Sequence, residues 1–565
     1  MNKHRSGYKK TAVIKPKAPE ITILTNEYKI AVCSQSYLGK KGYTIPKSVL
    51  SKEDDEFLRK DLFIKPLVIG ISYGDDVTSF PVYRENANKM YLPRFYGIAR
   101  YGLPKRNEIE PGDNINVPFE KPLRDYQDKI IQIYTDHVNK PIIDDVSLHN
   151  GSGGILEVPC GRGKTVMALK IISLLSKKTL ILVHKEFLMN QWIERIGEFL
   201  PTARVGKIQG PTFDINNKDI VIGMIQTLYD KEYSANTFSS FGLTIVDEVH
   251  RIGSEQFSRT LFKTITPYML GISATVDRKD KLTRVLHMFI GDKIYTEQRD
   301  SDDVVCVRAI NYATADPEFN NVELDFRGNT KYSTMITKLC AYGPRSDFVV
   351  GVISDLLKEE PENQIMVLCH NRNLLTYLNE AINHRKLATV GYYVGGMKQA
   401  NLQETETKQI VLATYAMAAE ALDIKTLSTL VMITPKTDVI QSVGRILRVK
   451  HDNPIIVDIV DAHDIFQNQW VQRRRFYKKC NYRIRQIDSK QYAGMTLDWD
   501  KDVTWKRVFE PKIDLCSAFA PNNNNNNNNN NDSDSDEGDS AHLKPIAGSN
   551  QGKCLIDVSI FSDVL

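Results

Sequence analysis

Short runs of branched apolar residues recur along this chain, each followed by a longer amphipathic stretch, and this alternation limits the folds that it can adopt. One set of runs covers residues 155–158, 180–183, 220–222, 243–246 and 269–272, and a second covers residues 365–368, 410–413, 430–433 and 455–457. Apolar runs of strand length that alternate with helical stretches are typical of parallel sheets with helices on both faces. We therefore expect an α/β protein with two lobes in tandem, at residues 119–300 and 345–490.

The remaining parts of the 565-residue chain differ from the lobes in composition. We expect a disordered basic leader at residues 1–20 and a small mixed α/β domain at residues 21–118, whose role, packing or substrate contact, stays open. Within that domain, strands are predicted at residues 21–24 and 66–69 and a charged helix at residues 52–60. An asparagine tract and an acidic run cannot bury a core, so we expect a low-complexity tail at residues 515–565.

The composition excludes several classes of protein. No apolar run reaches the roughly 18 residues that a membrane-spanning helix needs, and no apolar segment follows the basic N-terminus as in a secretory signal. The eight cysteines are scattered without a C-x-x-C pair, which argues against a zinc site and against a disulfide framework. We expect an intracellular protein, cytoplasmic or nuclear, that makes no contact with membranes.

A glycine-rich loop follows the first apolar run and precedes a helix expected at residues 166–175. Small residues let backbone N–H groups curl around a phosphate, and the helix N-terminus adds positive potential. Lys164 is expected to reach the β- and γ-phosphates of ATP, and Thr165 to bind Mg²⁺. The residues expected to bind the nucleotide in this region are Pro159, Cys160, Gly161, Arg162, Gly163, Lys164 and Thr165.

Two acidic residues, Asp247 and Glu248, end the apolar run at 243–246. Burying two acids at a strand end carries a large desolvation cost, so we expect a cation nearby that offsets this cost. We expect Asp247 to hold Mg²⁺ together with Thr165, and Glu248 to orient and polarise the attacking water. Lys164, Asp247 and Glu248 are therefore candidate catalytic residues.

The second lobe contains an arginine-rich stretch at residues 441–448. We expect a helix here, with Gln441, Gly444, Arg445 and Arg448 near one face. Arg445 and Arg448 can neutralise the charge that develops during phosphoryl transfer, which makes them candidate catalytic residues, and Gln441 is expected to contact the nucleotide. Because these residues come from the second lobe, ATP binding can close a cleft and hydrolysis can open it.

A basic cluster lies near the end of the second lobe. Its arginines are Arg473, Arg474 and Arg475, and its neighbours are Lys478, Lys479, Trp470, Phe476 and Tyr477. Basic groups neutralise phosphates and aromatic rings stack on bases, so we expect the arginines to bind nucleic acid. A solvated helix face is the alternative.

Together these motifs resemble the superfamily-2 helicases of the DEAH/DEVH type. The residues that carry the resemblance are the phosphate loop, Asp247-Glu248-Val249-His250, Ser273-Ala274-Thr275, the segment from Leu182 to Trp192, Gln226-Thr227, Thr414 with residues 420–423, and Gln441 to Arg448. More narrowly, residues 159–161, 247–250, 273–280 and 444–450 resemble those of the xeroderma-pigmentosum-B-type DNA translocases and of the transcript-release helicases of large cytoplasmic DNA viruses, and residues 41–46 and 92–97 favour the viral group. A viral origin would make the virion a further possible location.

The resemblance implies two tandem RecA-like lobes, ATP and Mg²⁺ as cofactors, and a groove that holds the sugar-phosphate backbone of a strand. It implies that Gln127 reads the adenine edge, that His250, Ser273 and Thr275 couple hydrolysis to movement, and that the candidate strand contacts are His184, Lys185, Thr227, Arg251 and Thr414. Backbone contacts follow a strand without reading its sequence.

We therefore expect an ATP-dependent helicase or translocase that moves along or unwinds DNA or RNA, in transcription and with transcription machinery as partner. One alternative is a translocase that remodels complexes without separating strands. Another, from a different class, is a P-loop ATPase or kinase that needs no nucleic acid. The arginine-rich stretch would have no explanation in a kinase, and no acceptor-binding motif is evident.

Overall fold

The structure is a computed structural model. It describes residues 24–65, 79–140, 152–159, 161–234, 236–249, 255–274, 276, 282–297, 305–420, 424, 426–446, 454–492 and 503–511. The leader at 1–20, the strand expected at 66–69 and the tail at 515–565 lie outside these residues, as do residues 21–23. Within the described residues, no helix is both long and apolar enough to cross a membrane.

The N-terminal part is a small mixed α/β unit around a five-stranded sheet of order β5-β6-β2-β1-β7. Its elements are α1 (Asn26–Gln35), β1 (Tyr37–Gly39), β2 (Gly42–Pro46), η1 (Lys47–Val49), α2 (Lys52–Asp61), β3 (Phe63–Ile64), β4 (Phe80–Pro81), β5 (Arg84–Glu85), β6 (Lys89–Leu92), α3 (Arg94–Tyr101) and β7 (Arg106–Asn107). The charged helix expected at 52–60 is α2, which Ser51 caps by accepting a hydrogen bond from the Asp54 N–H.

This unit shares its apolar core with the first lobe. Buried side chains of both, such as Leu92 and Phe289, belong to one continuous cluster. Arg94 is 5% exposed, and its guanidinium donates to the backbone carbonyls of Thr266 at 3.1 Å and Pro267 at 2.8 Å. Because a buried charge needs such acceptors, Arg94 ties α3 to the first lobe, and packing is a demonstrated role of this unit.

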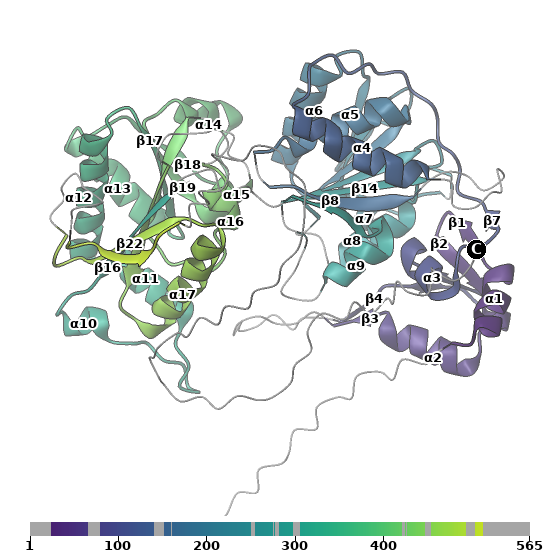
Figure 1. Ribbon diagram of the computed structural model, residues 1–565, viewed down its shortest axis with the longest axis horizontal. Helices are drawn as coiled ribbons and strands as arrows, with labels where there is room; N and C mark the ends of the chain where they lie inside the picture. The colour runs from purple at the N-terminus through teal and green to yellow at the C-terminus, as the bar shows by residue number, and fades with distance from the viewer. Residues whose placement is uncertain are drawn as a thin grey trace, which may run out of the picture. The chain divides into compact units, whose positions relative to one another are not determined.

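The first lobe contains an eight-stranded sheet of order β11-β10-β12-β9-β13-β14-β8-β15, parallel except at β11. Its elements are α4 (Asp125–Asn139), β8 (Gly153–Glu157), α5 (Lys164–Leu175), β9 (Thr179–Val183), α6 (Glu186–Phe199), β10 (Val205–Gln209), β11 (Thr212–Phe213), β12 (Ile220–Met224), α7 (Ile225–Asp230), β13 (Leu243–Asp247), α8 (Glu255–Lys263), β14 (Tyr268–Ser273), α9 (Thr283–Ile290) and β15 (Lys293–Thr296). Helices α4, α5 and α6 cover one face of the sheet and α7, α8 and α9 cover the other (Figure 1).

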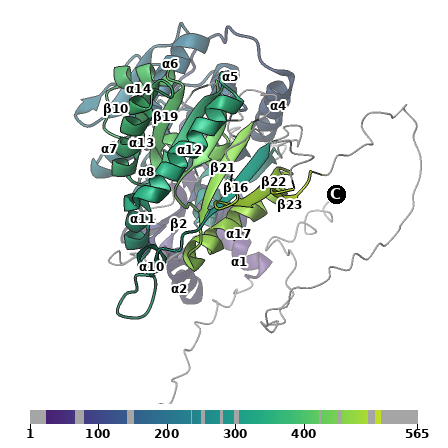
Figure 2. The same ribbon diagram turned by 90° about the vertical axis from the view of Figure 1, so that its left-hand side faces the viewer.

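The second lobe contains an eight-stranded sheet of order β18-β19-β17-β20-β21-β16-β22-β23, parallel except between β22 and β23. Its elements are β16 (Cys306–Tyr312), α10 (Pro317–Asn320), α11 (Tyr332–Ala341), α12 (Gly343–Glu359), β17 (Gln364–Cys369), α13 (Arg372–His384), β18 (Val390–Tyr393), α14 (Gln399–Glu406), β19 (Ile410–Thr414), α15 (Tyr415–Glu420), β20 (Leu427–Met432), α16 (Ile440–Val443), β21 (Ile455–Asp461), α17 (Asp464–Lys479), β22 (Arg483–Asp488) and β23 (Lys506–Phe509). Figure 2 shows α12 and α13 lying over the face of this sheet that is turned toward the viewer.

Two parallel sheets with helices on both faces confirm the expected fold class. The second sheet nevertheless extends beyond the expected range of 345–490, because β16 precedes that range and β23 follows it. The sequence of β16 mixes Arg308 and Asn311 with apolar residues, so it does not stand out as an apolar run. Its pairing with β21 and β22 places it inside the sheet all the same.

Candidate functional site

Residues expected in the ATP site follow the carboxyl ends of neighbouring strands in the first lobe. Strands β9, β13, β14 and β8 are consecutive in the sheet. The phosphate loop follows β8, Asp247 ends β13, Ser273 ends β14, and His184 follows β9. Ligands of open parallel sheets bind outside the carboxyl ends of the strands, so this edge is the candidate functional site.

The phosphate loop turns through two glycines in the left-handed region. Gly161 has φ +83° and Gly163 has φ +77°, conformations that a side chain would strain. A Cβ atom on Gly163 would also lie 2.3 Å from Gln127 Nε2. Helix α5 begins at the next residue, Lys164, so its first N–H groups and its positive end face the loop. This backbone can surround a phosphate, whereas Cys160 lies outside the described residues.

Arg162, within the loop, is held from two sides. Its carbonyl oxygen accepts hydrogen bonds from Gln127 Nε2 at 3.1 Å and from the Tyr126 hydroxyl at 3.3 Å. Its guanidinium lies 3.7 Å from the centre of the Tyr126 ring and donates to Glu297 Oε1. The start of α4 therefore clamps the loop. The expectation that Gln127 reads adenine stays a prediction, since its Oε1 and Nε2 here contact the backbone of Arg124 and Arg162.

The acidic pair stands opposite the phosphate-loop lysine. Lys164 Nζ lies 4.0 Å from Glu248 Oε1, and both side chains are largely buried. Glu248 has φ +50°, an uncommon conformation for a residue other than glycine. Such conformations persist where the surrounding structure imposes them, and they are frequent in active sites. The first turn of α5 and the end of β13 are thus brought together.

Burial gives the Asp247 carboxyl group unusual acid–base behaviour. Desolvation and the nearby Glu248 carboxylate raise the pKa of Asp247 to about 7, against the opposing effects of a Trp192 hydrogen bond and of Lys164. A bound cation would favour the charged form of such a carboxyl group. Mg²⁺ in nucleotide sites is usually held by one or two protein groups together with phosphates and water. Thr165 and Asp247 fit such an ion, although no cluster of three or more metal ligands occurs among the described residues.

The described candidate strand contacts lie in a loop, in the first turn of a helix and at the end of a strand. His184 and Lys185 stand between β9 and α6, and Lys185 is the residue that precedes the first turn of α6. Thr227 lies in α7, where its hydroxyl accepts a hydrogen bond from the Gly210 N–H at 3.0 Å. Thr414 ends β19 in the second lobe. The fifth candidate strand contact, Arg251, lies outside the described residues, as do His250 and Thr275, which were expected to couple hydrolysis to movement.

Two family descriptions and one long alignment identify the chain. A family described as "Type III restriction enzyme, res subunit" matches residues 120–278, and one described as "Helicase conserved C-terminal domain" matches residues 349–450. The chain is 32% identical over 461 residues to a protein of Acanthamoeba polyphaga mimivirus named as an ATP-dependent RNA helicase, L396. The alignment covers 79% of this chain and 85% of that protein. This chain belongs to the superfamily-2 helicases.

The helicase is similar to other viral proteins and to a DNA translocase. It is 27% identical over 397 residues to African swine fever virus QP509L, also named as an ATP-dependent RNA helicase, covering 65% of this chain and 74% of that protein. It is 31% identical over 209 residues to the DNA 3'-5' translocase XPB2 of Sulfurisphaera tokodaii, covering 36% of this chain and 43% of that protein. The expected resemblance to viral and XPB-type enzymes is confirmed, and the helicase is an ATP-hydrolysing enzyme that acts on nucleic acid.

Two residues that sequence reasoning did not assign to the site contact its central elements. Glu157 ends β8, and its carboxylate accepts hydrogen bonds from the Val276 N–H at 2.8 Å and from Lys293 Nζ at 2.8 Å. It therefore joins the strand before the phosphate loop to the segment after Ser273. Trp192 in α6 donates its indole N–H to Asp247 Oδ2 at 2.8 Å. An acid in an apolar run is a usable sequence signal for Glu157, whereas Trp192 belongs to a segment that carries the family resemblance but shows no sign in the sequence of its contact with Asp247.

The arginine-rich stretch of the helicase does not form the expected helix. Helix α16 ends at Val443, and Gly444 and Arg445 continue in a turn, in which the Arg445 N–H donates to the Ser442 carbonyl at 3.2 Å. Glycine is a poor helix former, so the helix stops where the sequence pattern continues. Arg445 is 7% exposed, and Arg448 lies outside the described residues. The expectation that the helix continues through Gly444 and Arg445 was wrong, whereas residues 447–448 lie outside the described residues and the roles of Gln441, Arg445 and Arg448 stay predictions.

The basic cluster on α17 is partly structural. Arg473 is 1% exposed, and its guanidinium donates to both Asp458 oxygens, at 2.7 Å and 2.9 Å, and to the Lys436 carbonyl at 2.7 Å. A guanidinium enclosed in this way cannot reach a phosphate, so the expectation that Arg473 contacts nucleic acid was wrong. Tyr477 is also buried, whereas Arg475 is exposed and Arg474 is half-buried. Arg474 and Arg475 stay predicted contacts.

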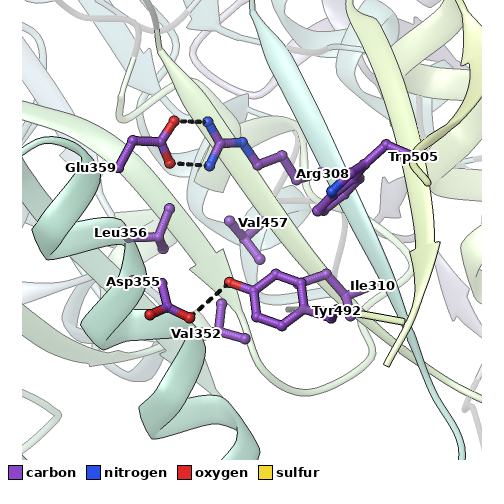
Figure 3. Close-up of a pocket in the computed structure, with 9 residues that line it drawn as sticks. All are labelled: Arg308, Ile310, Val352, Asp355, Leu356, Glu359, Val457, Tyr492 and Trp505. Atoms are coloured by element: carbon purple, nitrogen blue, oxygen red, sulfur yellow. Dashed lines mark hydrogen bonds and ion pairs between the residues drawn. The ribbon is translucent and has the colours of Figure 1, made fainter. Parts of the chain in front are cut away.

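A cavity in the second lobe lies between β16, α12 and the segments that follow β22 (Figure 3). Its polar groups pair with one another: Arg308 donates to both Glu359 oxygens at 2.5 Å and 2.6 Å, and the Tyr492 hydroxyl donates to Asp355 at 3.3 Å. Trp505 lines the same cavity. Because these polar side chains already satisfy one another, we interpret the cavity as a packing feature of the C-terminal segments rather than as a ligand site.

Proposed function

We propose that the helicase hydrolyses ATP at the edge formed by β8 and β13 and uses the energy to move along an RNA strand. The observation that carries this proposal is the approach of Lys164 to Glu248, 4.0 Å apart, next to a loop whose glycines leave room for phosphates. A cation-binding carboxylate, a phosphate-binding lysine and a water-orienting glutamate are the groups that phosphoryl transfer to water requires.

In this proposal the first turn of α5 and Lys164 bind the β- and γ-phosphates, while Thr165 and Asp247 would hold Mg²⁺. The ion, when bound with the nucleotide, would supply positive charge to the phosphate oxygens. Glu248 orients a water molecule, whose oxygen bonds to the γ-phosphorus as the bond between that phosphorus and the β–γ bridging oxygen breaks. The water proton passes by way of Glu248 to solvent, and the products are ADP and inorganic phosphate.

RNA is proposed as the strand because two relatives of the helicase are named as ATP-dependent RNA helicases. DNA is the second candidate, because a shorter stretch of the chain is similar to a DNA 3'-5' translocase. We further propose that the helicase works in transcription, which rests on the resemblance to transcript-release helicases. His184, Lys185, Thr227 and Thr414 are the proposed backbone contacts, which would follow a strand of any sequence.

The experiment that tests this function compares ATP hydrolysis with no nucleic acid, single-stranded RNA, double-stranded RNA, and DNA of the same length and sequence. Each rate is measured with and without Mg²⁺. The expected result is that RNA raises kcat more than DNA and that all activity needs the ion. If DNA raises kcat more than RNA does, DNA is the strand along which the helicase moves. A rate of ATP hydrolysis that is the same with and without nucleic acid would contradict the proposed motor and favour an ATPase that needs no nucleic acid.

A further inference from the structure

Trp192 makes a polar contact that its position in the core does not require. The residue lies in α6, is 1% exposed, and packs in the same apolar cluster as Met189 and Ile196. A buried indole N–H needs an acceptor, and a backbone carbonyl would serve. Here the acceptor is instead the carboxylate of Asp247, in β13, with Nε1 and Oδ2 separated by 2.8 Å. A core tryptophan thus donates to the acid that stands at the centre of the site.

The Asp247 carboxylate is held at both of its oxygens. Oδ2 accepts from Trp192, and Oδ1 accepts from the backbone N–H of Glu248 at 2.9 Å. Two donors from different elements fix the rotation of the carboxylate plane. Each carboxylate oxygen can accept more than one bond, so the pair of donors leaves capacity for a cation or for its water ligands. The direction in which the remaining lone pairs of the carboxylate point depends on the hydrogen bond from Trp192.

Outer partners of metal-binding side chains matter because they orient the ligand before the ion arrives. Their removal commonly weakens metal binding or activity by about 10- to 100-fold. The Glu248 N–H comes from the adjacent residue, whereas the Trp192 bond connects Asp247 to a helix of the covering layer. Helix α6 begins beside His184 and Lys185. The hydrogen bond is therefore a direct link between this helix and the acid.

We propose that Trp192 is a positioning residue that orients the Asp247 carboxylate for a divalent cation and so links α6 to the ATP site. The proposal rests on the proposed function, in which Asp247 is a cation ligand. Trp192 touches neither nucleotide nor water in this scheme and acts only through Asp247. Its removal should accordingly change cation affinity and kcat while the KM for ATP changes little.

The test measures Mn²⁺ binding to the ADP complex by electron paramagnetic resonance, which needs neither turnover nor nucleic acid. Trp192→Phe keeps an aromatic ring in the core and removes the donor. We expect it to weaken Mn²⁺ binding about tenfold. Trp470→Phe is the matched control, since Trp470 is 2% exposed but lies in the second lobe. The control should bind Mn²⁺ as the unmodified protein does.

A double-mutant cycle separates positioning from general damage to the core. In an Asp247→Asn background, the change Trp192→Phe should weaken Mn²⁺ binding no further, because the oriented carboxylate is already absent. If Trp192→Phe does not fold, replacing Trp192 by β-(3-benzothienyl)alanine keeps the ring shape and substitutes sulfur for the N–H group. Mn²⁺ affinity equal to that of the unmodified protein, in either folded variant, would overturn the proposal.

Failure of the proposed function would look different. It would appear in the unmodified protein, as hydrolysis that is insensitive to Mg²⁺ or to nucleic acid. Failure of the present inference would appear only as an unchanged Mn²⁺ affinity after removal of the Trp192 donor, with the unmodified protein behaving as proposed.

Discussion

Arg473 and Asp458 form a two-pronged ion pair inside the second lobe. Arg473 Nε lies 2.7 Å from Asp458 Oδ2 and Nη2 lies 2.9 Å from Oδ1, and the two side chains are 1% and 2% exposed. Burial alone would lower the pKa of Arg473, but Asp458 outweighs it and raises that pKa above its usual value. The pair fastens α17 to β21, so a residue that reads as part of a basic surface is a structural element of the core.

The change Arg473→Gln should therefore lower the free energy of unfolding of the helicase rather than weaken its binding to nucleic acid. It leaves the Asp458 carboxylate buried without its charged partner, which costs about 3–5 kcal/mol. Urea unfolding measures this free energy. Arg475→Gln, at an exposed position of the same helix, is the control and should stay within about 0.5 kcal/mol of the unmodified protein. A decrease below about 1 kcal/mol for Arg473→Gln would contradict the structural role.

Arg474 and Arg475 remain the candidates for nucleic-acid contact on α17. Replacing both by glutamine should weaken binding and flatten its salt dependence, by roughly one unit of slope for each phosphate that the protein no longer neutralises. ATP hydrolysis without nucleic acid should not change, because neither residue belongs to the candidate ATP site. Lys358→Gln provides a control, since Lys358 is 73% exposed on α12. An unaltered slope in the double variant would identify the segment as an ordinary solvated helix face.

Lys164→Ala should abolish ATP turnover and leave the fold intact. Lys164 is the first residue of α5, and its ammonium group faces the acidic pair. In the proposed function this group contacts the phosphates, and removing one charged contact to the transition state lowers kcat by about 10²–10³-fold or more. Steady-state hydrolysis and thermal melting are measured on the same samples. Lys170→Ala, in the same helix but with its ammonium 5.2 Å from the Phe119 ring, should retain activity. Near-normal turnover of Lys164→Ala would refute the proposed phosphate contact.

Glu248→Gln should bind ATP and hydrolyse it slowly. Glutamine keeps the shape of the side chain and removes the group that polarises water, a decrease of about 10²–10⁴-fold in kcat. Nucleotide affinity and single-turnover rate are the two measurements. The matched control is Glu255→Gln, because Glu255 pairs with Arg259 on the outside of α8. If Glu248→Gln loses nucleotide binding instead, Glu248 is a structural or cation-binding group and not the water-orienting one.

Arg94→Met should lower the free energy of unfolding while leaving ATP hydrolysis per folded molecule unchanged. The variant leaves the carbonyls of Thr266 and Pro267 without their charged donor, and hydrogen bonds of this kind contribute about 1.5–3 kcal/mol each. Urea unfolding gives the decrease, with Arg106→Met, 69% exposed on β7, as the control. Unchanged stability of Arg94→Met would contradict the packing role of Arg94.

Local patterns were sufficient for the fold class and for the outline of the ATP site. Strand-length apolar runs such as 180–183 and 243–246 became buried strands because a parallel sheet covered by helices on both faces buries both sides of its strands, which favours apolar residues there. The positions of Gly163 and Lys164 were readable because a turn with positive φ and a helix start are properties of adjacent residues. These features depend on residues that are adjacent in the sequence, so they can be predicted from the sequence alone.

Contacts between distant residues were decided by the tertiary structure alone. Trp192 meets Asp247, and Glu157 meets Lys293, because the sheet places β9, β13, β14, β8 and β15 side by side in an order that spacing does not encode. The sequence predicts Arg473 to be a surface cation, but in the structure Asp458 of β21 pairs with it in the core. The sequence by itself determined which chemical groups the helicase carries and roughly where strands such as β9 and β13 lie. Only the packed sheets decided which of those groups face one another, because burial and charge pairing depend on elements far apart in the chain.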